Sequence, residues 1–425
     1  MKRISSLVVM FLLVLVAVNV SLVEAAPTPI EIWSPLTGGK ASTFDALVKE
    51  FNQSQNDVVV TVVHQGGYDV VRQKMAAAAN ARNMPQMVLA DYIDVPLYVQ
   101  RNMIKPIGEV LSQDLIDDLY PGMLVDLTVD DTLYGVPYNR TTQGLIVNND
   151  LLKQAGIDRV ASTWDEYYED AVKFKKALGE DYYYGYAYFN QYIFEAIAYS
   201  FGATIATSDG KAMLTEDAMQ DLFEFFRKMY EEKLIVMVPT TAGGFADQHS
   251  TFLEGKVATV FQSSSFIPSA QKLLDYDWSF EYIPAGAGGH AITIGGTNLV
   301  VTNVVNDAEL EAARAFIEFV VRPENGAKVF VETANLPVRQ STLEIDSVQE
   351  YMAKNSFTGN LLGQLDYAHN ASAVTKNIGN VFGTVSDMIV RLIYNGENIQ
   401  NTLEEYNEMF QEEFDDKKLN GSFIY

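Results

Sequence analysis

The sequence predicts an α/β fold with mostly parallel sheets and at least two domains. Segments typical of strands and of helices alternate from Ile30 onward, which is the order expected where helices cover parallel strands. The chain has 425 residues, and a single hydrophobic core rarely grows beyond about 250 to 300 residues. Hydrophobic residues make up 48% of the chain and charged residues 20%, as in a well-packed globular protein.

The first part of this region predicts a βαβαβ unit. Strands are expected at residues 30–33, 58–63 and 86–90. Between them, one helix is expected to begin at a capping box at Ser42, and a second helix at residues 69–81. The first helix should bury four apolar residues on one face: Phe44, Leu47, Val48 and Phe51. Loops that follow the strands of such a unit form a natural ligand crevice.

The later part of the chain continues the alternation. Thr163 and Glu166 form a capping box that predicts a helix. Residues 182–192 are rich in aromatic side chains, and strands are expected within residues 252–265 and at 294–302. The last of these strands should cross back to the first domain. A helix at about residues 308–321 should stop before Pro323, because proline cannot continue it, and the tail from about residue 338 should be helical and acidic.

The N-terminus predicts export from the cytoplasm. Lys2 and Arg3 precede an apolar run and a small-residue site that ends at Ala25, so residues 1–25 are expected to be a signal peptide cut after Ala25. A membrane anchor is the alternative, but the apolar run of about 12 residues is shorter than the roughly 20 that a spanning helix needs. The chain has no cysteine, which excludes disulfides, thiol catalysis and a lipidated N-terminal cysteine. We therefore expect a secreted, non-lipidated periplasmic or extracellular protein.

The charge of the chain excludes some classes of partner. The formal net charge is -25, and removal of Lys2, Arg3 and Glu24 with the signal peptide takes it to -26. Such a field repels nucleic acid and anionic lipid surfaces. We expect no nucleic-acid partner, and we interpret the acidity as an aid to solubility rather than as a device for steering a ligand.

Five groups of short motifs occur in a characteristic order along the chain. They are found at residues 102–107, at 134–139 with 148–152, at 163–166, at 252–256, and at 295–296 with 316–325 and 335–337. In this order they resemble the family 1 extracellular solute-binding proteins of ABC importers, the group that contains maltose-binding and glycerol-phosphate-binding proteins. The resemblance covers nearly the whole chain after residue 30.

The resemblance implies a two-lobe periplasmic binding protein fold of type II, with lobes joined by hinge crossovers. It assigns residues 26–140 and about 297–335 to an N-terminal lobe, and residues 141–296 and 336–425 to a C-terminal lobe with the C-terminal helices. It also implies a monomer without a cofactor that closes on a small-molecule solute in the interlobe cleft. Closure follows because the solute contacts both lobes only in the closed state. The partners would be the permease subunits of an ABC transporter.

Candidate ligand-binding residues follow from their position after strands and from their chemistry. Carbohydrates bind to planar polar groups and to aromatic faces. The candidates are Trp33, Tyr68, Asp91, Tyr92, Thr141, Thr142, Tyr188, Asn190, Ser263, Gly296 and Asn335. The resemblance matches most of these to family positions: an aromatic at Tyr68, an acidic or aromatic pair at 91–92, a hydroxyl pair at 141–142, a serine at 263, a backbone contact at 296 and, at 335, a position that is often aromatic.

Structural alternatives stand beside several candidates. Tyr68 could be a solvated loop residue, Asp91 could cap a helix that starts near Val95, and Ser263 could be only a helix N-cap. Most rings of residues 182–192 should pack in a core, so only Tyr188 and Asn190 are chosen there. Trp33 could be structural or ligand-binding.

The expected ligand is a carbohydrate, most simply a di- or oligosaccharide. Glycerol-phosphate binders of this family use an arginine in the C-terminal helical region, whereas the matching residues 377–386 contain no basic side chain. Arg140 could partly substitute, or it could form an exposed or lobe-bridging salt bridge. Because burying a phosphate without a cation or a set of N–H donors is costly, a neutral sugar is expected rather than an anion, and glycerol 3-phosphate or a glycerophosphodiester is the alternative ligand.

Enzyme classes find little support in the sequence. Four histidines, His64, His249, His290 and His369, are scattered without the spacing of a zinc site. No G-x-S-x-G elbow or P-loop occurs, and the G-x-G-x-x-A pattern at 286–291 precedes an expected strand instead of the helix that a dinucleotide site requires. We expect no catalytic residue, no metal and no enzyme activity. A secreted glycoside hydrolase is the alternative, although no carboxylate pair on strand ends supports it.

Overall fold

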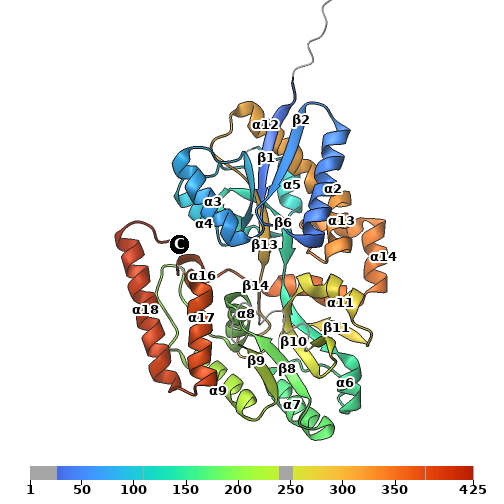
Figure 1. The fold of residues 1–425 in the computed structure, drawn as a ribbon, viewed down its shortest axis with the longest axis vertical. Helices are drawn as coiled ribbons and strands as arrows, with labels where there is room; N and C mark the ends of the chain where they lie inside the picture. The colour runs from blue at the N-terminus through green and yellow to red at the C-terminus, as the bar shows by residue number, and fades with distance from the viewer. Residues whose placement is uncertain (1–25, 109, 239–251, 379, 425) are drawn as a thin grey trace, which may run out of the picture.

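Two five-stranded sheets organise the protein (Figure 1). The computed structural model describes residues 26–108, 110–238, 252–378 and 380–424. The predicted signal peptide, residues 1–25, and His249 lie outside the described residues. Within the described part of the chain, no helix is both long and apolar enough to span a membrane.

The first sheet contains the predicted βαβ elements. Its strands, in the order β2-β1-β3-β13-β6, are β2 (Val58–His64), β1 (Thr28–Ser34), β3 (Met87–Asp91), β13 (Gly295–Val301) and β6 (Gly135–Thr141). β1 runs parallel to β2 and β3, whereas β13 runs antiparallel to β3 and β6. The helices around it are α2 (Gly38–Ser54), α3 (Tyr68–Ala81), α4 (Val95–Gln100), α5 (Gln113–Asp118), α12 (Asp307–Val320), α13 (Pro323–Thr333) and α14 (Asp346–Lys354). The strand expected at 294–302 therefore does cross back to the first sheet.

Helix α2 begins one turn earlier than predicted. Its N-cap is Thr37, and the Ser42 Oγ donates to the Gly38 carbonyl at 3.3 Å, so the predicted capping box at Ser42 is wrong. A serine inside a helix can donate from its hydroxyl to the carbonyl four residues earlier. Ser42 therefore lies within the helix and does not cap its N-terminus. The four predicted apolar residues of this helix are buried.

The second sheet is assembled from later segments. Its strands, in the order β11-β7-β10-β8-β9, are β11 (Trp278–Glu281), β7 (Gln143–Asn148), β10 (Val257–Ser263), β8 (Tyr183–Tyr188) and β9 (Ile235–Val238). Its helices are α6 (Asn149–Gln154), α7 (Trp164–Leu178), α8 (Gln191–Phe201), α9 (Asp217–Glu231), α11 (Ile267–Leu273) and α15 (Phe357–Gly363). Thr163 caps α7 as predicted, because its Oγ1 accepts from the Glu166 N–H at 3.3 Å. The Glu166 carboxylate binds Ser162 and Arg159 instead of completing the box.

Short strands and 3-10 helices lie between the longer elements. Two-stranded ladders pair β4 (Thr128–Val129) with β5 (Thr132–Leu133), and β12 (Ile292–Thr293) with β14 (Ala368–His369). The 3-10 helices are η1 (Pro121–Met123), η2 (Val125–Leu127), η3 (Ser264–Phe266), η4 (Gln340–Glu344) and η5 (Gln364–Tyr367). β6 ends in the first sheet at Thr141 and β7 begins in the second at Gln143. The crossover between these strands supports our proposal of a lobe boundary near residue 141, with residues 26–140 and about 297–335 in the N-terminal lobe and about 141–296 and 336–425 in the C-terminal lobe. Arg339 pairs with Asp118 and α14 packs on α13, so residues 336–354 lie beside the first sheet although this division assigns them to the C-terminal lobe.

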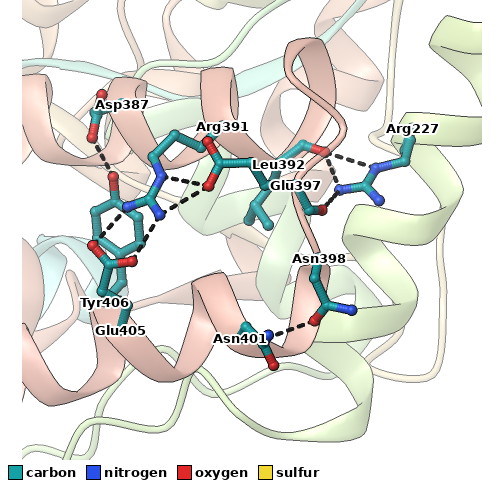
Figure 2. A network of polar contacts seen from close by, with 9 residues as sticks. All are labelled: Arg227, Asp387, Arg391, Leu392, Glu397, Asn398, Asn401, Glu405 and Tyr406. Atoms are coloured by element: carbon teal, nitrogen blue, oxygen red, sulfur yellow. Dashed lines mark hydrogen bonds and ion pairs between the residues drawn. The ribbon is translucent and has the colours of Figure 1, made fainter.

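The C-terminal helices pack beside α9 (Figure 1). They are α16 (Ala373–Asn377), α17 (Val381–Ile389), the π-helix η6 (Val390–Tyr394) and α18 (Ile399–Leu419). Figure 2 shows the polar contacts that join them: Arg391 binds Glu397 at 2.9 Å and Glu405 at 2.7 Å, while Arg227 of α9 donates to the carbonyl oxygens of Leu392 and Glu397. These contacts and buried residues of α18, such as Phe410 and Phe414, fix this helical flank.

Candidate functional site

An open cavity of about 650 Å³ lies between the strand ends of the first sheet and the starts of helices α8 and α17. Ligand pockets of small molecules commonly measure about 300 to 1,000 Å³. One side is formed by residues 66–70, Arg72, Asp91 and Ile93, which lie at or after the carboxyl ends of β2 and β3 of the first sheet. The other side is formed by Gln191 at the start of α8 and by Asn380 and Val381 at the start of α17. The cavity therefore lies at the carboxyl ends of parallel strands, where α/β folds bind ligands.

Tyr68 is the aromatic residue of this cavity. The turn after β2 uses Gly66 in a left-handed conformation, φ +87°, which a residue with a side chain adopts with strain. Tyr68 then begins α3, is half-buried and lines the cavity. The alternative of a freely solvated loop tyrosine is wrong, and burial raises the pKa of its hydroxyl. Its ring can supply an apolar face while the hydroxyl stays protonated.

Arg72, one helical turn after Tyr68, is held by three carboxylates. Its Nε lies 2.5 Å from Asp94 Oδ1, its Nη1 2.7 Å from Asp69 Oδ1, and its Nη2 3.6 Å from Asp91 Oδ2. Burial raises the pKa of Asp91 and of Asp94, whereas the positive charge of Arg72 acts in the opposite direction. Asp91 keeps an edge that lines the cavity. The alternative that Asp91 caps α4 is wrong, because the N-cap position of α4 is occupied by Asp94.

Tyr92, Thr141 and Thr142 are buried. Tyr92 is 5% exposed, and its ring packs against Tyr192 with centroids 6.4 Å apart. Tyr192 donates from its hydroxyl to the Thr141 carbonyl at 3.0 Å, and the Thr142 N–H donates to the Ser264 Oγ at 3.2 Å. These three candidates thus join the first crossover to the second sheet, and they are not among the residues that line the cavity.

Arg140 is fully buried at 0% exposure. It donates to Asn298 Oδ1 at 2.9 Å and to the Ile294 carbonyl at 3.0 Å, and its Nη2 lies 3.5 Å from Asp126 Oδ2. Burial lowers the pKa of Arg140, and the charge of Asp126 opposes this change. Of the two salt-bridge alternatives, exposed or lobe-bridging, the exposed one is wrong, because Arg140 pairs with Asp126 inside the protein. Arg140 also does not line the cavity, so it does not replace the missing arginine of the C-terminal region.

Other candidates have structural contacts. Ser263 is the N-cap of η3 and accepts from the Ser265 N–H at 3.3 Å, so the N-cap alternative describes its position. Asn335 is buried and donates to Asn139 Oδ1 and to Thr333 Oγ1. The Trp33 Nε1 donates to Glu31 at 2.8 Å. None of these three is among the residues that line the cavity.

Gly296 is packed against the backbone of the neighbouring strand. It adopts φ +108°, and its carbonyl accepts from the Tyr92 N–H at 3.1 Å. A Cβ atom at this position would lie 2.2 Å from the Asn139 carbonyl oxygen. Only a glycine lets the backbone of β13 pack this closely against Asn139 of β6. The expected contact of Gly296 with a ligand stays a prediction.

Sequence reasoning came within one residue of a polar group that lines the cavity. Tyr188 ends β8, and Asn190 caps α8 by accepting from the Ile193 N–H at 2.9 Å. The next residue, Gln191, lines the cavity, is 7% exposed and has an Oε1 without a hydrogen-bond partner among the described residues. Arg72 and Asn380 were also missed. The spacing of Arg72 four residues after Tyr68 places both on one helix face, which was the available signal.

Glu195 is a buried carboxyl group that the sequence did not reveal. Its Oε1 accepts from the Ser372 N–H at 3.2 Å and from the Thr375 Oγ1 at 2.5 Å, while its Oε2 has no partner among the described residues. Burial raises the pKa of Glu195, and the nearby charge of Asp126 adds to the increase. The folded protein thus binds this proton more tightly than the unfolded chain does.

The raised pKa predicts a pH-dependent effect of Glu195→Gln. A carboxyl whose folded-state pKa is raised contributes most to stability below its unfolded pKa, near 4, and this contribution falls as pH rises toward the folded pKa. The Gln variant lacks this loss. We therefore expect its Tm to exceed that of the wild type by more at pH 8 than at pH 5, in thermal unfolding at matched ionic strength. A difference that stays constant or grows toward acid pH would contradict the assignment.

No group of three or more His, Cys, Asp or Glu side chains in the described ranges has an arrangement that could hold a metal ion. The polar groups of the cavity can instead form hydrogen bonds to a neutral or charged organic solute. Carboxylate and amide oxygens accept from hydroxyl groups, and the guanidinium of Arg72 orders the carboxylates around it.

Comparison with known proteins gives this geometry a family. The model of a family described as bacterial extracellular solute-binding protein matches residues 46–355. The chain belongs to this family. The sn-glycerol-3-phosphate-binding periplasmic protein UgpB of Pectobacterium atrosepticum is 23% identical over 352 residues, which cover 78% of each protein.

Solved structures show the same fold as this solute-binding protein. UgpB from Mycobacterium tuberculosis in complex with glycerophosphocholine has a TM-score of 0.81 at 22% identity, over 92% of this chain and 99% of that chain. The cyclic alpha-maltosyl-1,6-maltose binding protein from Arthrobacter globiformis has a TM-score of 0.78 at 19% identity, over 91% and 99%. The predicted two-lobe α/β fold of type II is confirmed, and so is the predicted role as an extracellular solute-binding protein.

Proposed function

We propose that this solute-binding protein binds a hydroxylated solute, a di- or oligosaccharide in the first place, and delivers it to the permease subunits of an ABC importer. The observation that carries the proposal is the cavity lined from two sides: Tyr68 and Asp91 follow the first sheet, and Gln191 and Asn380 belong to the other lobe. Oxygen acceptors on both sides and one aromatic ring suit a sugar. A solute held by both sides favours the closed state and so signals its presence without chemistry.

Glycerol 3-phosphate or a glycerophosphodiester is the second candidate. Relatives and a solved neighbour carry such ligands in their names, and Arg72 is a cation in the cavity wall. Against this candidate, the positive charge of Arg72 is already balanced by Asp69, Asp91 and Asp94.

A thermal-shift screen of residues 26–425 tests the proposal. The panel contains mono- and oligosaccharides, polyols and glycerol phosphodiesters. A ligand at 100 times its Kd adds about 2.7 kcal/mol to the free energy of unfolding, which raises the Tm measurably. A saturable increase with a neutral sugar supports the first candidate, an increase only with phosphate esters supports the second, and no increase with any member contradicts both.

Asp91→Asn is expected to weaken binding of the identified solute by about ten- to a hundredfold. Burial raises the pKa of Asp91 to about 8, so the comparison is made at about pH 9, where the side chain is charged. A hydrogen bond to a charged group contributes about 1.5 to 3 kcal/mol, and the amide retains only one acceptor oxygen. Isothermal titration calorimetry measures the loss. Asp307→Asn, an exposed change at the start of α12, is the matched control. Equal affinity of wild type and Asp91→Asn would remove Asp91 from the ligand site.

Export, lipid state and association form the remaining part of the proposal. We propose that residues 1–25 are removed after Ala25 during export, that the product is a non-lipidated periplasmic monomer, and that it has no catalytic activity. Intact mass of the exported protein tests the cleavage site, and analytical ultracentrifugation tests the monomer. Incubation with the bound oligosaccharide, followed by chromatography of the products, tests the glycoside hydrolase alternative.

A further inference from the structure

A second, smaller cavity adjoins the ligand cavity. Its volume is about 200 Å³. Three residues line both cavities: Arg72, Ile93 and Val381. The second cavity also has Arg101, directly after α4, on one side, and Lys376 of α16 with Lys417 of α18 on the other. Figure 1 shows α4 facing α16 and the end of the chain. The two cavities are thus neighbouring compartments of one cleft.

The second compartment is positively charged. Among its described lining residues are four basic side chains and one carboxylate, Asp94, which already accepts from Arg72 at 2.5 Å. Within the described ranges, neither Arg101 nor Lys376 has an ion-pair partner, and Lys417 lies 3.8 Å from Glu413. The chain has 55 acidic residues against 30 Lys and Arg. Arg72 is balanced by its three carboxylates and Lys376 acts at longer range on Asp126, so the local feature that is unusual in so acidic a protein is the pair Arg101 and Lys376, which has no carboxylate within ion-pair distance among the described residues.

The first compartment has the opposite character. Asp69 and Asp91 face it together with Arg72, so carboxylates outnumber cations there. A negatively charged group would be repelled by these carboxylates but would form charge-assisted hydrogen bonds with Arg101 and Lys376. Hydroxyl groups, in contrast, can donate to Asp91 and to Gln191 in the first compartment.

We infer that the cleft is bipartite and that its solute carries an anionic group, a carboxylate or a phosphate ester, which lies between Arg101 and Lys376 while the hydroxylated part occupies the first compartment. This inference rests on the proposed function and deepens it. The basic subsite is assembled from both lobes, because Arg101 follows α4 and Lys376 belongs to α16. An anion contacts both side chains only when the lobes are close, so its binding favours closure.

The chain end holds the two basic residues in position. The Gln100 Nε2 donates to the carbonyl oxygens of Gly421 at 3.2 Å and Phe423 at 2.9 Å. On the other side, Asn377 donates to the Ile424 carbonyl at 2.9 Å and accepts from its N–H at 2.8 Å. Gln100 precedes Arg101 in the sequence, and Asn377 follows Lys376. Because both Gln100 and Asn377 bind residues 421–424, this segment fixes the backbone next to each of the two basic residues on opposite sides of the cleft.

Titration calorimetry with matched neutral and acidic probes tests the inference. The pairs are maltose with digalacturonate, and glycerol with glycerol 3-phosphate, which separates a carboxylate from a phosphate source. The proteins are the wild type, Arg101→Gln/Lys376→Gln, the charge-conserving Lys376→Arg and the control Lys354→Gln, an exposed change on α14. Unliganded Tm values verify that each variant is folded.

We expect one acidic probe to bind the wild type at least about tenfold more tightly than its neutral partner, with an affinity that falls as salt rises. The double variant should lose at least about tenfold in affinity for that acidic probe, whereas Lys376→Arg and Lys354→Gln should retain it. Equal binding of neutral and acidic probes, or an unchanged double variant, overturns the bipartite cleft and leaves the proposed function standing. Binding of none of the four probes overturns both.

Discussion

Arg140→Met is expected to lower the free energy of unfolding by about 3 to 5 kcal/mol, because it removes one partner of a buried ion pair. Arg140 is completely buried, and Asp126 is 8% exposed with an Oδ1 that has no hydrogen-bond partner among the described residues. Without the guanidinium, Asp126 becomes an uncompensated buried charge, and Asn298 and the Ile294 carbonyl lose a donor. Urea unfolding followed by tryptophan fluorescence measures the change.

A double variant separates the ion pair from the packing of Arg140. Arg140→Met with Asp126→Leu removes both charges, and buried pairs replaced by apolar residues often keep their stability. We therefore expect the double variant to be more stable than Arg140→Met alone. If instead the losses of the two single variants simply add, the two side chains are not coupled, and the interpretation of Arg140 as an internal structural charge fails.

The sequence predicted the order of elements because alternation and capping are local signals. The strands at 30–33, 58–63 and 86–90 appear as β1, β2 and β3, and β13 crosses back to the first sheet as expected. Local signals misled at Ser42, where the helix begins earlier, and in part at Glu166, whose carboxylate binds Arg159 and Ser162 instead of completing the capping box. The sequence predicted that β13 returns to the first domain, but its pairing with β3 joins segments about 200 residues apart, and no local signal specifies that partner or its register.

The cavity was harder to predict than the fold. Position after a strand selected Tyr68 and Asp91 correctly as cavity residues, yet the same rule selected Thr141 and Ser263, which face the lobe crossover and a helix N-terminus. Which side of a strand end meets the opposite lobe depends on packing between distant segments. Arg72 and Gln191 were missed for this reason, since their role arises from partners on other elements.

Gly296→Ala is expected to destabilise the protein by about 2 to 5 kcal/mol. The φ of +108° costs a residue with a side chain about 1 to 3 kcal/mol, and overlap in a packed interior costs a similar amount. The new Cβ would lie 2.2 Å from the Asn139 carbonyl oxygen and 3.1 Å from the Arg140 Cα. Both neighbours are backbone atoms, so a side-chain movement cannot relieve the overlap. The Tm and the urea midpoint measure the effect.

Gly39→Ala is the matched control, because Gly39 of α2 has no positive φ and a Cβ atom at this position would have no heavy atom within 4 Å outside its own helical turn. Alanine there should be neutral or should stabilise the protein by a few tenths to about 1 kcal/mol. Solute affinity then decides between the two roles of Gly296. If its role is close packing of β13 against β6, the folded fraction of Gly296→Ala retains the affinity of the wild type. A variant of normal Tm but weakened binding would instead show that the Gly296 backbone contacts the solute.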